Sequence, residues 1–476
     1  MTSRIRCSAV AAAVLLGMSA SGARAQTVQE LQQQIDELKA QIKALTAAQA
    51  SVSPAAPVAA PEVTAPTPSP PDQTAAAAPT PPTPPAAVAA DVADRPWYNR
   101  LRLRGYTQVR YNAIVAGDDA PQADGSRLRS VHDTSINDDG GFLLRRVRLV
   151  LQGPVTDNVE IYLQQDFGVA VNNQSGAERR ENFGQLRDAY VDLFDPSRRF
   201  RLRLGQSKVP FGWENLQSSS NRVPLDRSDA INSGVPGERD VGIVGYYTPR
   251  RVQAVWNRLA GDGQKLFGNY GAFGLGVFNG QGTNRAERND SRAVVAMATW
   301  PFELDGLGGA FRGQVLEVGG SAMLNRYRPE LRSGGVSGGD YDDNRVALHA
   351  ILYPQPFGVQ AEWTFGRAPE FNAVSRGIAN DTLAGGYVQL MYNLGETPAG
   401  RIVPYGRWQR YRGGWKASTN APRLETDEIE IGVEWEFVDS LELTLAYARM
   451  KRREADERRQ GRAEGDLIRA QLQFSY

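Results

Sequence analysis

The sequence predicts an all-β protein: a 16-stranded antiparallel transmembrane β-barrel, preceded by a short N-terminal coiled coil and a Pro/Ala-rich linker. The last ten residues, LIRAQLQFSY, alternate apolar and polar side chains and end on the aromatic Tyr476. Transmembrane barrels close their sheet with such a strand, apolar toward lipid and polar toward water. Sixteen alternating segments follow one another between Trp97 and Tyr476, and the even number suits a bacterial barrel.

The N-terminus has the features of a signal peptide over residues 1–25. Arg4 and Arg6 precede a short apolar run at 9–17 and a small-x-small cleavage site. Removal of this segment takes Cys7, the single cysteine, out of the mature chain. Disulfides, thiolate metal sites and cysteine nucleophiles are therefore excluded.

Composition narrows the protein class further. A mean hydropathy of −0.42 excludes a helical membrane protein but suits a barrel, because only alternate strand residues face lipid. The 54 basic and 53 acidic residues nearly balance, so net charge gives no argument for binding nucleic acid.

Residues 26–50 carry a heptad pattern that predicts a coiled coil. The apolar positions are Val28, Leu31, Ile35, Leu38, Ile42 and Leu45. A lone amphipathic helix is the alternative, because about three heptads are marginal for a free helix in water. β-branched residues alternating with Leu favour two strands, but tethering to a trimeric barrel would override that preference.

Residues 51–96 form a Pro/Ala/Thr-rich segment with almost no charge, which predicts an extended linker. At about 3.1 Å per residue it could span on the order of 100 Å. Such a spacer suits a periplasmic extension, with contact to the cell wall as one open role.

Residues 97–476 are the expected barrel domain. The clearest alternating runs are Arg100–Tyr111, Arg145–Gly153, Glu160–Phe167, Phe200–Gln206, Val359–Phe365, Ile429–Phe437, Leu441–Ala448 and Leu467–Phe474. Val252–Asn257 would make a seventeenth strand, so we assign it to a loop. Short links such as 438–440 predict periplasmic turns, and long ones such as 112–141 predict external loops.

Arginines gather on the face that the alternation turns toward the lumen. Three strands contribute Arg102, Arg104, Arg110, Arg146, Arg148, Arg201 and Arg203. Arginine keeps its charge at any working pH, and its planar fork suits oxyanions. Rings of such residues favour anion passage. The alternative is that these arginines only pair with carboxylates, since Glu428, Glu430, Glu434 and Glu436 are expected on the same lumen surface.

A long segment from Ser207 to Ser228 follows the fifth strand, and its length and Pro/Gly content mark it as a loop. It could fold inward as a constriction or remain on the surface. In this region the sequence resembles the phosphate-selective porin O/P family. The matching motifs are Arg-Arg-x-Arg at 145–148, Lys-x-Pro-Phe-Gly at 208–212, Asp-Arg-Ser at 226–228, Val-Phe-Asn-Gly at 277–280, and the stretch from Tyr-Gly-Arg-Trp-Gln at 405–409 through Glu434-Trp435.

The resemblance covers residues 97–476 and implies a trimeric outer-membrane barrel whose third external loop narrows the pore. It also implies an arginine ladder that feeds a basic central site. Lysines are scarce for such a site, and Lys208, Arg222 and Arg227 are the candidates in the loop. An anion-permeable porin is therefore the safer expectation than a phosphate-specific one.

The sequence contains only weak candidates for a catalytic or metal-binding motif. Gly335-Val336-Ser337-Gly338-Gly339 fits a nucleophile-elbow pattern, but it lies in a glycine-rich turn instead of a strand–turn–helix. His132 and His349 are the only histidines and are isolated, which makes a poor case for zinc. We expect no enzyme activity, no cofactor and no metal.

The sequence therefore predicts a passive channel in the outer membrane of a Gram-negative bacterium, with its N-terminal extension in the periplasm. Its expected solutes are small inorganic anions, with phosphate a candidate. Its expected partners are outer-membrane lipid, lipopolysaccharide and two further copies in a homotrimer. A general, weakly selective porin and a barrel that mainly tethers the membrane to the cell wall remain alternatives.

Overall fold

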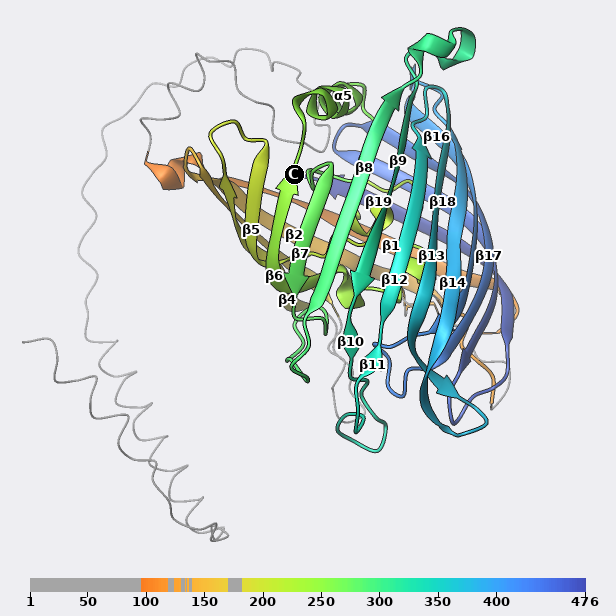
Figure 1. Ribbon diagram of the computed structural model, residues 1–476. Coiled ribbons are helices and arrows are strands. Elements are labelled where there is room, and N and C mark those ends of the chain that lie inside the picture. Colours follow the sequence, from red (N-terminus) through yellow and green to blue (C-terminus); the bar gives the residue numbers. More distant parts are fainter. Residues whose placement is uncertain (1–95, 119–123, 130–132, 134, 137–138, 170–181) are drawn as a thin grey trace, which may run out of the picture. The chain divides into compact units, whose positions relative to one another are not determined.

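The computed structural model describes residues 96–118, 124–129, 133, 135–136, 139–169 and 182–476. The predicted signal peptide, the coiled coil, the linker up to residue 95, and His132 lie outside the described residues. The described part is a barrel of long strands joined by loops and short helices (Figure 1).

The strands are β1 (Arg102–Ala116), β2 (Gly141–Thr156), β3 (Val159–Val169), β4 (Phe183–Phe194), β5 (Phe200–Lys208), β6 (Arg239–Tyr247), β7 (Phe273–Phe278), β8 (Ala293–Glu303), β9 (Val315–Leu324), β10 (Arg326–Tyr327), β11 (Tyr341–Asp342), β12 (Asn344–Leu352), β13 (Phe357–Asn372), β14 (Gly377–Tyr392), β15 (Glu396–Thr397), β16 (Gly400–Gly414), β17 (Arg423–Val438), β18 (Leu441–Ala455) and β19 (Ala463–Ser475). The helices are η1 (Trp97–Arg100), α3 (Trp213–Leu216), α4 (Asp229–Asn232), η2 (Pro236–Glu238), α5 (Arg250–Gly261), η3 (Asp305–Leu307) and η4 (Gly309–Phe311).

Each long strand pairs antiparallel with the next along the chain, and pairing of β1 with β19 closes the ring. Two-residue β15 only extends the turn before β16, and β10 and β11 form a separate ribbon. The wall is therefore a closed 16-stranded antiparallel barrel, which confirms the predicted fold class for the described residues.

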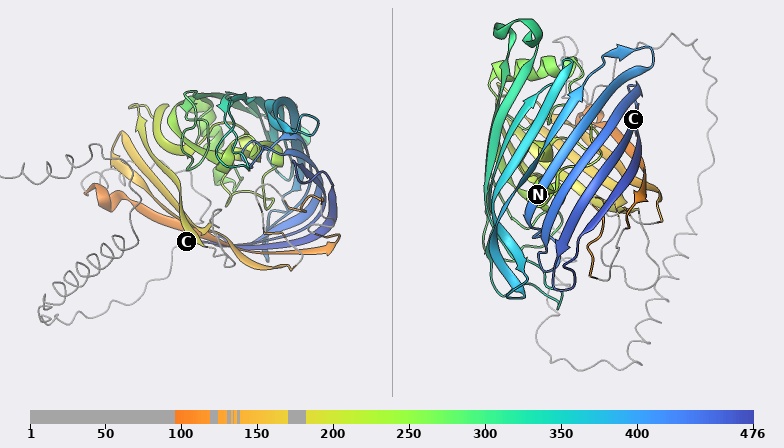
Figure 2. Two further views of the ribbon diagram at one scale, coloured as in Figure 1. Left: turned by 90° about the horizontal axis from the view of Figure 1, so that it is seen from below. Right: turned by 90° about the vertical axis from the view of Figure 1, so that its right-hand side faces the viewer.

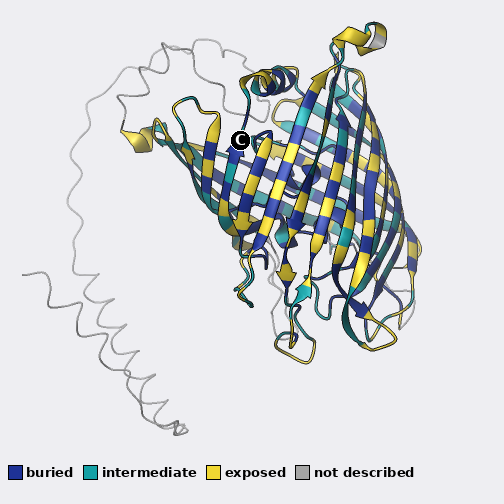
Figure 3. Ribbon diagram, in the orientation of Figure 1, coloured by how far each residue is buried: buried dark blue, intermediate teal, exposed yellow. Residues whose placement is uncertain are grey.

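Side chains alternate across this wall, as the bands of buried and exposed residues in Figure 3 show. On β19, Ile468, Leu472 and Phe474 are exposed, whereas Arg469 and Gln471 are buried inside. Exposed apolar side chains around the outside form the surface that a barrel presents to lipid.

Closure depends on a close approach at the chain's end. Gly105 and Tyr476 exchange two backbone hydrogen bonds of 2.6 and 3.0 Å. A Cβ on Gly105 would lie 2.5 Å from the Tyr476 ring and 2.4 Å from the Arg148 carbonyl oxygen. Only glycine lets the final aromatic residue cover β1 at this position.

One half of the interior is apolar. The inner faces of β6–β9 and β12 pack against α3 and α5 in one hydrophobic cluster that includes Phe211, Trp213, Trp256 and Phe267. Helix α5 replaces the loop predicted at Val252–Asn257, so that assignment was wrong: Val252, Val255, Trp256 and Leu259 follow helical spacing and are buried. Among the described residues, no helix is long and apolar enough to cross a membrane.

We predict that Gly105→Val weakens barrel closure. The added side chain collides with backbone and ring atoms, and such overpacking costs about 1–3 kcal/mol. The urea midpoint of unfolding in lipid vesicles, followed by tryptophan fluorescence, should fall. Gly406→Val is the matched control, because nothing lies within 4 Å of a Cβ at that strand position. Equal midpoints for the two variants would contradict the role of Gly105.

Candidate functional site in the barrel lumen

The chain between β5 and β6, residues 209–238, lies inside the barrel, and we call it the lumen loop. It carries α3, α4 and η2, and most of its side chains are buried. Seen along the barrel, its ribbon lies within the ring of strands (Figure 2). The sequence had left an inward constriction and a surface loop open, and the structure has the inward one.

One wall holds the start of the lumen loop through carboxylates. Glu362 on β13 accepts the backbone N–H groups of Trp213 and Glu214 at 2.6 and 3.0 Å. The Glu214 carboxylate in turn accepts a hydrogen bond from Arg407 on β16 at 2.7 Å. These bonds fix α3 against β13 and β16.

A second part of the wall, formed by β1 and β19, holds the loop through Asp226. Its Oδ2 accepts hydrogen bonds from Arg110 on β1 at 2.8 Å and from Arg469 on β19 at 2.6 Å. Both arginines also reach Asp133, at 2.6 and 2.8 Å. Burial alone raises the pKa of the Asp226 carboxyl, but Arg110 and Arg469 outweigh it and hold that pKa well below its usual value. The loop is therefore pinned by a carboxylate that stays ionised.

A β-bulge adds a further arginine to this wall. Gln108 pairs with Arg146 but Val109 pairs with Leu144, so Arg145 is the extra residue. Simple alternation would turn Arg145 outward with Val147. The bulge instead brings its guanidinium to 3.6 Å from the Asp226 carboxylate, with the side chain 14% exposed.

Two buried arginines beside Asp226 are short of partners. Arg146 donates to the Gln108 side chain at 2.7 Å, but its Nε and Nη2 have no hydrogen-bond partner among the described residues. All three guanidinium nitrogens of Arg222 lack one, although the residue is only 4% exposed. Burial is the largest effect on the Arg222 pKa and lowers it, yet a guanidinium remains charged in proteins. We call Arg146 and Arg222 the open arginine pair.

Arg146 is surrounded by other arginines, whereas the carboxylates of Glu238, Glu214 and Asp226 are the charges that act most strongly on Arg222. Arg145, Arg148, Arg222 and Arg110 are the cations that act most strongly on Arg146. The nearest carboxylate to Arg146 is that of Asp226, at 3.9 Å, and this carboxylate already serves three other arginines. Positive charge therefore exceeds negative charge around Arg146.

Hydroxyl groups border the same region. Arg148 donates to the Tyr106 and Ser219 oxygens at 2.8 and 2.9 Å and is paired with Asp166 at 2.7 Å. Ser219 belongs to the lumen loop, so this contact ties the loop to β2. Arg148 is thus neutralised, in contrast to the open arginine pair.

The other predicted arginines of the strands are placed differently. Arg203 makes two 2.8 Å bonds to Asp192, and Arg201 donates to the Asn269 carbonyl at 2.6 Å. Arg104 is half-buried and donates to Gln152 at 3.2 Å, while Arg102 is exposed at the start of β1. These side chains share the predicted face, but the structure does not bring them together with Arg222.

Lys208 and Arg227, two of the residues predicted to bind anions in the loop, instead hold the loop in place. Lys208 donates to the carbonyls of Asn215, Leu216 and Gln217 at 2.9, 3.2 and 2.7 Å. Arg227 pairs with Glu238 at 3.0 Å and donates to the Asn215 side chain at 2.6 Å. Lys208 has no N–H left for a solute.

The acidic wall predicted on β17 is partly neutralised. Glu434 and its neighbour Glu442 both accept from Lys265, at 2.6 and 2.7 Å. Glu436 pairs with Arg401 at 3.0 Å, and Glu430 accepts from Tyr405 at 2.8 Å. Glu428 lies 3.9 Å from Arg452. Lys265 is thus shared by two carboxylates, and the Tyr405 hydroxyl carries no positive charge, so this wall keeps part of its negative charge.

Comparison with known proteins identifies the family. The family model described as phosphate-selective porin O and P matches residues 116–476. The chain belongs to this family. The resemblance seen in the sequence is thereby confirmed, and the protein is an outer-membrane porin.

Three solved structures of outer-membrane proteins that are similar to this porin share little of its sequence. The outer-membrane channel DcaP of Acinetobacter baumannii is 16% identical, with a TM-score of 0.47, and covers 79% of this chain and 97% of its own. Salmonella typhi OmpF is 11% identical, with a TM-score of 0.48 and coverages of 80% and 99%. Pseudomonas putida OprB is 10% identical, with a TM-score of 0.44 and coverages of 79% and 94%. No curated protein matches the chain.

Within the described part of this porin, no group of three or more His, Cys, Asp or Glu side chains is arranged to hold a metal ion. Ser337 donates to the Gly339 carbonyl in a loop, and His349 on β12 lies within hydrogen-bond distance of Thr299 at 2.8 Å.

We predict that the Asp226 anchor resists acid. Because the pKa of Asp226 is depressed on folding, its stabilisation is present above the unfolded pKa of about 3.9 and is lost only at lower pH. Titration of Asp226 should therefore add no step to the wild-type single-channel conductance between pH 7 and about pH 4. Asp226→Asn should release the loop and change the conductance at every pH, because it leaves buried arginines underpaired.

Asp157→Asn, at an exposed turn residue, is the control and should behave as wild type. A wild-type conductance step between pH 6 and 4 that Asp226→Asn abolishes would contradict the anchor's depressed pKa.

Proposed function

We propose that this porin is a passive diffusion channel for small inorganic anions, with the open arginine pair as the anion-binding site of its constriction. The observation that carries the proposal is the buried Arg222, whose three nitrogens have no acceptor among the described residues. A buried, unsatisfied charged donor is costly, so an acceptor that arrives with the solute is favoured there.

An oxyanion suits the chemistry of the pair. Guanidinium groups offer planar, paired N–H donors that match two oxygens of phosphate, and the bonds are strengthened by charge. Chloride would gain the electrostatic attraction without the paired geometry. The surrounding arginines raise the local anion concentration, and flux then follows the gradient across the membrane.

The layout of the lumen supports an anion path on one side. The apolar cluster of α3, α5, β6–β9 and β12 fills one half of the interior. The polar side carries the open arginine pair, and Glu434 and Glu436 on β17 are paired with Lys265 and Arg401. The proposal also includes phosphate as the preferred anion and assembly as a homotrimer. Each of these two parts needs an experiment of its own.

We predict that Arg222→Gln weakens phosphate binding by about tenfold, since a hydrogen bond to a charged group contributes roughly 1.5–3 kcal/mol. The purified porin is reconstituted in a planar bilayer, and block of chloride current by phosphate is titrated. The reversal potential across a KCl gradient should also move toward that of an unselective pore.

Arg367→Gln is the control, because Arg367 is exposed on the outer face of β13 and should leave both measurements unchanged. A wild-type channel that is cation-selective or insensitive to phosphate would overturn the proposal and favour a general porin.

A further inference from the structure

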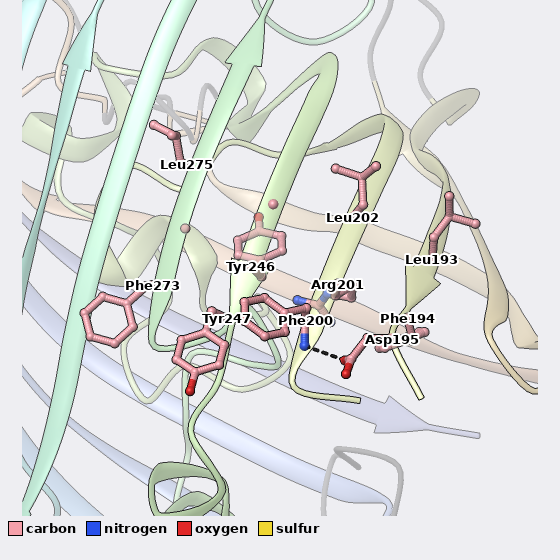
Figure 4. Close-up of a pocket in the computed structure, with 12 residues that line it drawn as sticks. Leu193, Phe194, Asp195, Phe200, Arg201, Leu202, Tyr246, Tyr247, Phe273 and Leu275 are labelled. Atoms are coloured by element: carbon pink, nitrogen blue, oxygen red, sulfur yellow. Dashed lines mark hydrogen bonds between the residues drawn. The ribbon is translucent and has the colours of Figure 1, made fainter. Parts of the chain in front are cut away.

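A groove of about 550 Å³ lies on the outside of the barrel over β4–β7, at the strand ends that adjoin the short β4–β5 turn and the α5 connection between β6 and β7. Figure 4 shows the side chains that border it. Leu193, Leu202, Phe200, Tyr247, Phe273 and Leu275 surround it, and Gly245 lies in its floor.

The groove exists because one outward position lacks a side chain. In the strand register, Gly245 on β6 stands between Leu202 on β5 and Leu275 on β7. The nearest atom to a Cβ at Gly245 would be a backbone oxygen at 4.0 Å. Strands lie about 4.8 Å apart, so the two leucines enclose a channel roughly 10 Å across between their backbones.

Aromatic rings form the rim of the groove at its turn-side end. Phe200, Tyr247 and Phe273 occupy the next row of the register, with ring centroids 4.5 and 6.3 Å apart. Aromatic side chains of barrels gather at the level of the lipid headgroups. The groove therefore runs from the headgroup level into the hydrocarbon region.

Cations border the same end. Arg199 in the turn before β5 accepts the Thr248 N–H on its carbonyl at 2.9 Å, which brings this turn beside the start of α5. Arg250 and Arg251 open α5, are exposed, and have no hydrogen bond or ion pair with other described residues. The turn's own carboxylate, Asp195, accepts the Phe200 N–H at 2.7 Å.

Other charges nearby balance each other. Arg198 pairs with Glu160, and its guanidinium lies 3.9 Å from the centroid of the Phe194 ring. This leaves Arg199, Arg250 and Arg251 against the single carboxylate of Asp195, so the rim beside the apolar groove has an excess of positive charge.

We propose that this groove is a binding site for one anionic phospholipid of the periplasmic leaflet. One acyl chain lies over Gly245 between Leu202 and Leu275, and the phosphate contacts the basic rim. The acyl chain gains van der Waals contact with the side chains that border the groove, and each arginine near the headgroups adds attraction for negative charge. A second copy of this barrel, docked by the same surface, would bring the same arginines to the groove, and like charges would then repel each other.

The test uses the full chain, reconstituted with phosphatidylglycerol or phosphatidylcholine of identical acyl chains and analysed by native mass spectrometry. The wild type should retain one phosphatidylglycerol per protomer in preference to phosphatidylcholine. Gly245→Leu fills the groove and should abolish retention of both lipids. Gly406→Leu, which adds the same side chain at an open strand position on β16, should retain them.

A second variant pair tests the headgroup. Arg250→Gln/Arg251→Gln should lower the preference for phosphatidylglycerol by at least about fivefold. Arg367→Gln/Arg410→Gln removes two exposed arginines from β13 and β16 and should leave the preference unchanged.

Equal lipid retention by Gly245→Leu and Gly406→Leu would overturn the proposal. Dissociation of an oligomer by Gly245→Leu, with no lipid bound to the wild type, would also overturn it and assign the groove to a second copy of the chain. Because the groove faces away from the lumen, its variants should conduct anions as wild type, so this test is independent of the pore's selectivity.

Discussion

The arrangement of the lumen depends on the ion pairs that Asp226 makes across it. This single carboxylate lies within 4.0 Å of four arginines from β1, β2 and β19, and it draws the lumen loop against their wall. Its charge is too small to neutralise all of them, even with Asp133 beside it. The ion pairs of Asp226 hold the lumen loop inside the barrel, and they leave N–H donors of the open arginine pair without acceptors in the described part of the chain.

Apolar packing fills another part of the interior, away from the excess of arginines over carboxylates around Asp226. Trp213 of α3 and Trp256 of α5 both donate to the buried Glu317 carboxylate on β9, at 3.1 and 3.0 Å. Thr299 and Tyr353 donate to it as well, at 2.8 and 2.9 Å. These neutral donors hold the lumen loop and α5 against β8, β9 and β12. The arginines lie on the other, polar side of the lumen.

The sequence could predict the faces of the strands but not their partners. Period-two alternation placed Arg146, Arg148 and Arg203 toward the lumen, because a strand admits only two faces. It could not show that Arg148 and Arg203 are paired with Asp166 and Asp192 while Arg146 is not, since that depends on the register of neighbouring strands and on a loop. Arg145 was missed because a bulge breaks the alternation, and Arg469 lay on the predicted polar face of the last strand without being counted in the ladder. The helical spacing of Val252, Val255, Trp256 and Leu259 was a usable signal for α5 that a search for strands overlooked.

The central claim is that Arg222 and Arg146 hold an oxyanion inside the constriction. Crystals of the full chain soaked in arsenate, an analogue of phosphate, allow the bound anion to be located by anomalous scattering at the arsenic edge. We expect a peak within hydrogen-bond distance of both guanidinium groups, which weakens when phosphate is added in competition. A lumen without such a peak, with Arg222 paired to a carboxylate of the chain, would contradict the claim.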